Sequence, residues 1–137
     1  MKQKKHVIVV GGGAAGMVAA ISARRSGVDV TILERNPRVG KKILATGNGR
    51  CNFTNINTDI GYYHGSNPKF AYSALSKFTA NDTIRFFEKL GIEHKVEDLG
   101  KVFPMSDQAS SILDVLLYEL NEIEINIVCD AYVKAII

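Results

Sequence analysis

Residues 6–34 read HVIVVGGGAAGMVAAISARRSGVDVTILE, and the order of residue types in this stretch decides the fold. An apolar, β-branched run at 6–10 leads into a glycine-rich turn, an alanine-rich helix follows, and a second apolar run at 28–33 ends at Glu34. Apolar side chains at consecutive positions are typical of a parallel strand that is buried on both faces. The stretch therefore predicts a strand–helix–strand unit with two adjacent parallel strands.

The glycine-rich turn has the GxGxxG spacing of dinucleotide-binding loops. Gly11 suits a tight turn, Gly13 lets the backbone approach a diphosphate, and Gly16 lets the helix pack closely on the strand. The helix N-terminus, with Ala14 and Ala15 in its first turn, presents unpaired N–H groups and the positive end of the helix dipole. The turn therefore predicts a diphosphate site that needs no lysine.

Glu34 ends the second strand about 20 residues beyond Gly13, where an acid accepts both ribose hydroxyls of an adenosine. A carboxylate there also repels a 2′-phosphate, which favours FAD or NAD over NADP, although the neighbouring Arg35 weakens this preference. FAD and NAD both stay open at this point. The alternative interpretation is a glycine turn in an α/β protein that binds no nucleotide.

Composition and charge narrow the class of protein. The chain has 137 residues, 46% hydrophobic and 23% charged, with a net charge of +3, as expected for one globular domain. The lysines at positions 2, 4 and 5 form a solvated terminal group, so we expect no nucleic-acid partner. No apolar run is long enough to span a bilayer, which predicts a cytoplasmic protein without a membrane partner. Cys51 and Cys129 lie far apart without a CxxC motif, so no redox pair and no metal site is predicted.

The rest of the chain continues an α/β pattern. The predicted segments are a loop at 36–65, a helix at 68–78 with Phe70, Ala74 and Phe78 on one side, a helix at 80–90 with a capping box at 79–82, a hairpin of strands 92–97 and 101–103, a helix capped by Ser106 with apolar positions from 112 to 120, and strands at 123–128 and 131–137. This order predicts a Rossmann-like, doubly wound parallel sheet that binds FAD or NAD(P). A helical and hairpin insertion at about 36–105 follows the second strand and is long enough to suggest a function of its own.

A second motif at 38–55, RVGKKILATGNGRCNFTN, makes the comparison specific. It is similar to the BaiN/YhiN-type flavoproteins, or aminoacetone oxidase family of FAD-binding enzymes, in which Gly-Arg/Lys-Lys-Leu runs into Gly-x-Gly-Arg-Cys-Asn-x-Thr-Asn. The pieces at 70–74, 86–88 and 102–104 also resemble that family, so the similarity covers almost the whole chain.

The resemblance implies an FAD-dependent oxidoreductase that transfers hydride between a reduced nicotinamide, NADH or NADPH, and an unidentified small organic substrate. Family members are much longer and carry a substrate domain and a C-terminal segment that completes the flavin site. The resemblance therefore implies that residues 1–137 are the N-terminal part of an FAD-binding domain, truncated before those two parts.

The second motif also supplies candidate cofactor-binding residues. Lys42 and Arg50 bring positive charge toward phosphates or a reduced flavin, and Asn52 and Thr54 offer short hydrogen-bonding groups. By resemblance, the backbone of Val133 touches the adenine. The alternatives are two Asn-Gly turns with solvated bases, and a core strand valine at 133.

Cys51 borders the same motif, and Arg50 beside it is expected to lower the pKa of the thiol. A lone cysteine without a second one is more often structural, so we assign no catalytic residue. Two alternatives to the enzyme remain: a non-catalytic adenine-dinucleotide-binding module, and an inactive remnant or a half that needs a C-terminal partner. Exposed apolar strand edges also predict self-association.

Overall fold

A computed structural model describes residues 5–137, so the lysines at positions 2 and 4 lie outside the described residues. The chain divides into two compact units, one formed by residues up to 45 together with 113–137 and the other by residues 46–112. Helix α4 (Ala109–Glu122) begins in the second unit and continues into the first.

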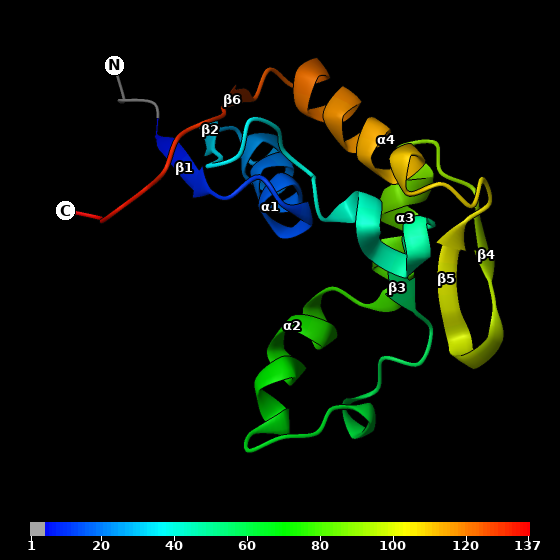
Figure 1. The fold of residues 1–137 in the computed structure, drawn as a ribbon. Coiled ribbons are helices and arrows are strands. Elements are labelled where there is room, and N and C mark those ends of the chain that lie inside the picture. The colour runs from blue at the N-terminus through cyan, green and yellow to red at the C-terminus, as the bar shows by residue number, and fades with distance from the viewer. Residues whose placement is uncertain (1–4) are drawn as a thin grey trace. The chain divides into compact units, whose positions relative to one another are not determined.

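The first unit contains the predicted strand–helix–strand arrangement. Strand β1 (His6–Val10), helix α1 (Ala14–Arg25) and strand β2 (Asp29–Leu33) follow one another, and α1 packs on both strands (Figure 1). Strand β6 (Asn126–Val128) pairs with the other edge of β2, which gives a parallel sheet of order β1-β2-β6. The predicted parallel pairing of the first two strands is confirmed.

Close contact between α1 and the turn before it depends on one glycine. A Cβ atom at Gly16 would lie 1.8 Å from the carbonyl oxygen of Gly11, a distance that no side chain tolerates. The helix buries Met17, Ala20 and Ile21 on one face. Gly27, at a φ of +87°, follows the helix as a left-handed cap, as predicted.

Burial of β1 is where the prediction for this sheet is wrong. Within the described residues β1 has a neighbouring strand on one side only, and Ile8 is 53% exposed. Val7 and Val10 are also exposed, so the packing of α1 on β1 leaves much of the strand open to solvent. A doubly apolar strand indicates a parallel partner, but its sequence does not reveal how many neighbours it has.

The second unit is built around a small antiparallel sheet of order β3-β5-β4. Its elements are β3 (Thr54–Asn55), the 3₁₀ turns η2 (Ile60–Tyr62) and η3 (Pro68–Ala71), helices α2 (Tyr72–Lys77) and α3 (Ala80–Lys89), β4 (His94–Val96), the turn η4 (Asp98–Gly100) and β5 (Lys101–Pro104), and the 3₁₀ segment η1 (Ile43–Gly49) leads into it. The predicted β4–β5 hairpin and the capping box between Thr79 and Asp82 are confirmed.

Three local predictions are wrong. The segment predicted as one helix at 68–78 forms the turn η3 and the shorter helix α2, and Phe70 and Phe78 are exposed, Phe70 at 86%. Ser106 accepts from the N–H of Gln108 in the turn before α4 and does not cap the helix itself, because the helix begins at Ala109. Residues 123–125 complete the turn after α4, so the following strand starts only at Asn126.

The expected strand at 131–137 is also absent. The N–H groups of Asp130 and Ala131 instead donate to the carbonyl oxygens of Asn36 and Glu34, at 3.1 and 2.9 Å. These bonds connect Asp130 and Ala131 to the loop after β2. The apolar residues that follow Ala131 form no strand. Among the helices of residues 5–137, none has both the length and the apolar character to cross a membrane.

The open edge of β1 generates a prediction. We expect the chain to self-associate in sedimentation velocity, because an uncovered apolar edge strand is a template for pairing. Ile8→Lys should shift the distribution toward monomer by placing a charge on that edge. Ile56→Lys is the matched control, since Ile56 is 50% exposed and lies in the other unit. A monomeric unaltered chain, or equal effects of the two lysines, would contradict the prediction.

Candidate functional site

A cleft of about 300 Å³ opens in the first unit where β1 and β2 end. It is lined by Val10, Gly11, Gly12, Gly13, Leu33, Glu34, Arg35, Asn36, Arg38, Gly40, Lys41, Lys42, Ala131, Tyr132 and Val133. The carboxyl ends of parallel strands are the usual ligand-binding edge of an open α/β sheet. The position of the cleft therefore marks the candidate site.

The carboxylate of Glu34 is the central polar group of the cleft. Its Oε2 accepts from the N–H of Gly12 at 2.7 Å, and its Oε1 accepts from the backbone and side-chain nitrogens of Asn36 at 2.8 and 2.6 Å. Glu34 is only 7% exposed. The hydrogen bonds from the backbone of Asn36 and Gly12 hold the pKa of this carboxyl below its ordinary value, so it is ionised at neutral pH.

The glycine turn is held from its other side as well. The N–H of Gly40 donates to the carbonyl oxygen of Gly12 at 2.7 Å, and a Cβ at Gly12 would lie 2.3 Å from Val39. The loop after β2 thus packs directly on the turn before α1. The two loops form the wall of the cleft as one hydrogen-bonded piece.

The turn is open on the side where α1 begins. Gly13 is the N-cap of α1, has an ordinary extended φ of −79°, and has no atom within 4 Å of an added Cβ. No acidic residue lies in the first turn of the helix. The free N–H groups and the positive end of the helix dipole therefore favour an anion at this point.

Positive charge surrounds the same cleft. Arg35, Arg38, Lys41 and Lys42 all line it and are all exposed. With Glu34 as the single acid in the lining, the cleft has the electrostatics of a site for a ligand with several negative charges.

The structure brings together part of the predicted set. Gly11, Gly13, Glu34, Arg35, Lys42 and Val133 line the cleft. Ala14, Ala15 and Gly16 form the start of α1 but are not in the lining, and Arg50, Cys51, Asn52 and Thr54 belong to the second unit. The cofactor contacts of all these residues stay predictions.

Sequence reasoning missed Asn36, Arg38, Lys41 and Tyr132 among the lining residues. The three residues in the loop after β2 carry a usable signal, because they follow the acid directly in a short polar and basic stretch. Tyr132 had no such signal, since it was placed inside a strand that the structure does not contain.

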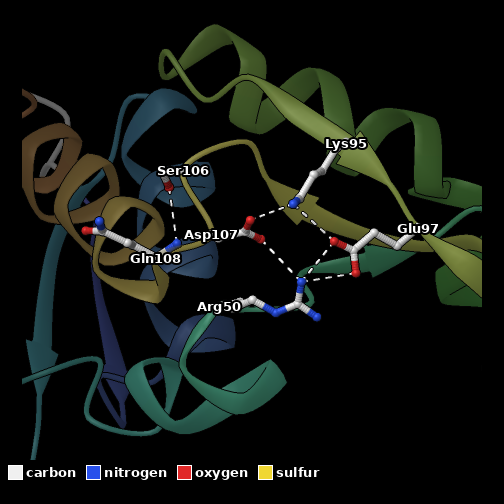
Figure 2. A network of polar contacts seen from close by, with 6 residues as sticks. All are labelled: Arg50, Lys95, Glu97, Ser106, Asp107 and Gln108. Carbon is white, nitrogen blue, oxygen red and sulfur yellow. Dashed lines mark hydrogen bonds and ion pairs between the residues drawn. The ribbon is translucent and has the colours of Figure 1, made fainter.

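In the second unit, Arg50 belongs to a closed ring of four charges (Figure 2). Its Nη1 lies 2.9 Å from Oε1 of Glu97 and 3.3 Å from Oδ1 of Asp107, while Nζ of Lys95 lies 3.1 Å from Glu97 and 2.6 Å from Asp107. The guanidinium also stacks 4.1 Å from the ring centre of Phe103. The carboxylates of Glu97 and Asp107 thus contact the positive charge of Arg50, which was predicted to lie beside a cofactor.

Cys51 corrects another expectation. Its thiol is buried, and burial raises the pKa of Cys51 where a lowered pKa was predicted. The neighbouring Arg50 does not offset this, because its guanidinium is directed into the ring with Glu97 and Asp107. Cys51 is therefore not an activated thiolate in this structure.

Comparison with known proteins identifies the family. The family model of the HI0933-like protein Rossmann domain matches residues 5–137. The chain belongs to the HI0933-like family. This confirms the predicted resemblance to BaiN/YhiN-type flavoproteins and the predicted Rossmann-type FAD-binding fold.

Two curated relatives of this HI0933-like domain have names that describe different reactions. A 3-dehydro-bile acid delta(4,6)-reductase of Clostridium scindens is 47% identical over 130 residues, which cover 93% of this chain and 32% of the relative. A ribosomal RNA dihydrouridine synthase of Escherichia coli is 41% identical over 117 residues, 85% of this chain and 29% of the relative. The chain thus spans about a third of the length of these relatives.

Among solved structures, THI4 of Thermovibrio ammonificans resembles the HI0933-like domain with a TM-score of 0.55 at 17% identity, over 92% of this chain and 38% of that one. This likeness concerns the fold alone.

The sequence predicted that the protein has no nucleic-acid partner. The comparisons do not support that exclusion, because one relative is named as a ribosomal RNA dihydrouridine synthase.

The buried carboxylate generates a stability prediction. Glu34→Gln should lower the free energy of unfolding by about 1–3 kcal/mol. Both oxygens of the carboxylate accept hydrogen bonds from N–H groups, and in glutamine one of them is replaced by an NH₂ group that cannot accept. Urea denaturation measures the change. Glu122→Gln is the control, an exposed glutamate in α4 whose replacement should change stability by less than about 0.5 kcal/mol. Equal effects of the two variants would refute the assigned role.

The charge ring generates a pH prediction. The cations of the ring hold the pKa values of Glu97 and Asp107 below their ordinary 4.5 and 3.8. Their contribution to stability is therefore complete above those values and is lost as the pH falls through the lowered pKa values. Thermal unfolding between about pH 6 and pH 2 should show a smaller acid loss for Arg50→Met than for the unaltered chain. Arg38→Met, outside the ring, should keep the full loss; identical curves for all three would contradict the assignment.

Proposed function

We propose that this chain forms the adenosine- and diphosphate-binding part of an FAD-dependent oxidoreductase. The supporting observation is a single cleft wall in which an ionised, buried Glu34 and the open Gly13 lie on loops that are hydrogen-bonded to each other. An acid for a ribose and a helix N-terminus for a diphosphate are the two contacts that an adenine dinucleotide requires.

Each group of the cleft has a separate task in this proposal. The N–H groups at the start of α1 hold the diphosphate, and Gly13 leaves room for it. Glu34 accepts from the ribose, and the exposed Lys41 and Lys42 add charge beside the phosphates. FAD, when bound, supplies the hydride chemistry, while the protein supplies orientation and charge.

For the whole protein we propose reduction of a carbon–carbon double bond in an unsaturated ring. The support comes from the names of the two relatives, a delta(4,6)-reductase and a dihydrouridine synthase. In the net reaction a reduced nicotinamide loses a hydride and is oxidised, one carbon of the double bond gains that hydride, and the other gains a proton from solvent. A steroid-like small molecule and a uridine of RNA are both substrates of this class.

Binding and stability should respond in opposite directions to Gly13→Asp. Aspartate is a better N-cap than glycine and favours the helix dipole, so the melting temperature should stay or rise. Its carboxylate would lie where the diphosphate is proposed, so the affinity for FAD and ADP should fall more than about tenfold. Gly13→Asn is the matched neutral control and should retain more affinity. Isothermal titration measures the binding of both ligands, and the visible flavin spectrum gives a second measurement for FAD.

The outcomes separate the candidates. Binding of ADP and NAD without FAD would favour a non-catalytic dinucleotide module. Absence of heat with FAD, NAD and ADP would refute the proposed site. Equal affinity of the Asp and Asn variants for ADP would also count against a diphosphate at the start of α1.

A further inference from the structure

The hydrogen bonds of Glu34 limit what this carboxylate can still bind. A carboxylate offers about four acceptor positions on its two oxygens. Three N–H groups already occupy positions on Glu34, one from Gly12 and two from Asn36. One position remains, whereas a ribose presents two hydroxyls.

Asn36 provides most of this restriction. Its backbone N–H and its side-chain Nδ2 both donate to the same oxygen, Oε1 of Glu34, and its carbonyl oxygen accepts from the N–H of Asp130. The residue is therefore held through its backbone on one side and directs its amide onto the carboxylate on the other. The oxygen Oε2 receives only the N–H of Gly12 and keeps the remaining acceptor position.

We propose that Asn36 is a positioning residue of the adenosine site, which orients Glu34 so that its one remaining acceptor position faces a ribose hydroxyl. The inference rests on the proposed function, because it assumes that the cleft holds an adenosine. It revises the two-hydroxyl contact expected from the sequence. Asn36 also lines the cleft, so it acts at the site and not from a distance.

The experiment compares ligands that differ by one hydroxyl. Titrations of the full chain with ADP, 2′-deoxy-ADP and 3′-deoxy-ADP should show one analogue binding about tenfold more weakly than ADP, which is the value of one hydrogen bond to a charged group. The other analogue should stay within about threefold of ADP. Without the Asn36 amide the carboxylate of Glu34 is no longer held toward that hydroxyl, so Asn36→Ala should weaken ADP binding about tenfold. The affinity for the sensitive analogue should change little, because that analogue lacks the hydroxyl.

Two further variants keep the test clear of folding effects. Asn36→Ser retains a donor on the side chain and should give an intermediate affinity for ADP. Asn121→Ala, on the exposed surface of α4, should change nothing. The melting temperature of each variant shows whether the fold is intact before the titrations are compared.

The results distinguish this inference from the proposal beneath it. If Asn36→Ala weakens ADP and both deoxy analogues by the same factor, Asn36 acts only on loop structure and the inference is overturned. Equal losses for the two analogues in the unaltered chain would overturn the one-hydroxyl limit. If ADP binds and Asn36→Ala does not change its affinity, only this inference fails. If ADP does not bind the unaltered chain, the adenosine site fails with it.

Discussion

The buried carboxylate of Glu34 is the constraint on which the first unit depends. A charge at this depth is stable only when hydrogen bonds replace its lost water, and three N–H groups from two loops do so. One loop joins β1 to α1, and the other follows β2. Because Gly40 also bonds to Gly12, the two loops are fixed to each other at both the nitrogen and the oxygen of one glycine. Hydrogen bonds within the protein therefore hold the wall of the cleft in place.

Two glycines of one motif serve opposite purposes in this arrangement. At Gly16 the space for a side chain is filled by the carbonyl group of Gly11, so the glycine is required by the fold. At Gly13 the space is empty, so the fold itself tolerates a side chain there. Gly16 is therefore the part of the motif that serves packing. Gly13 is the part that is free to face a ligand.

Sequence patterns predicted the features that depend on near neighbours in the chain. The strand–helix–strand unit, the capping box at Thr79 and the β4–β5 hairpin all follow from residues within a few positions of each other. Apart from the shifted ends of local elements, the failures concern distant contacts. The exposure of Ile8 depends on the number of strands beside β1, and the burial of the Cys51 thiol has no signal in the sequence of its own motif. The orientation of the Asn36 amide toward Glu34 likewise has no pattern in the sequence.

The ring of Arg50, Glu97, Lys95 and Asp107 has a consequence for sequence change over time. Each member contacts two members of opposite charge, so the ring alternates in sign all the way round. Loss of any one member leaves the two like charges that flanked it with a single ion of opposite charge between them. A neutral replacement at one position is therefore best tolerated together with a neutral replacement of one of its two oppositely charged neighbours. Descendants of this chain should exchange these four positions in concert, as coupled pairs.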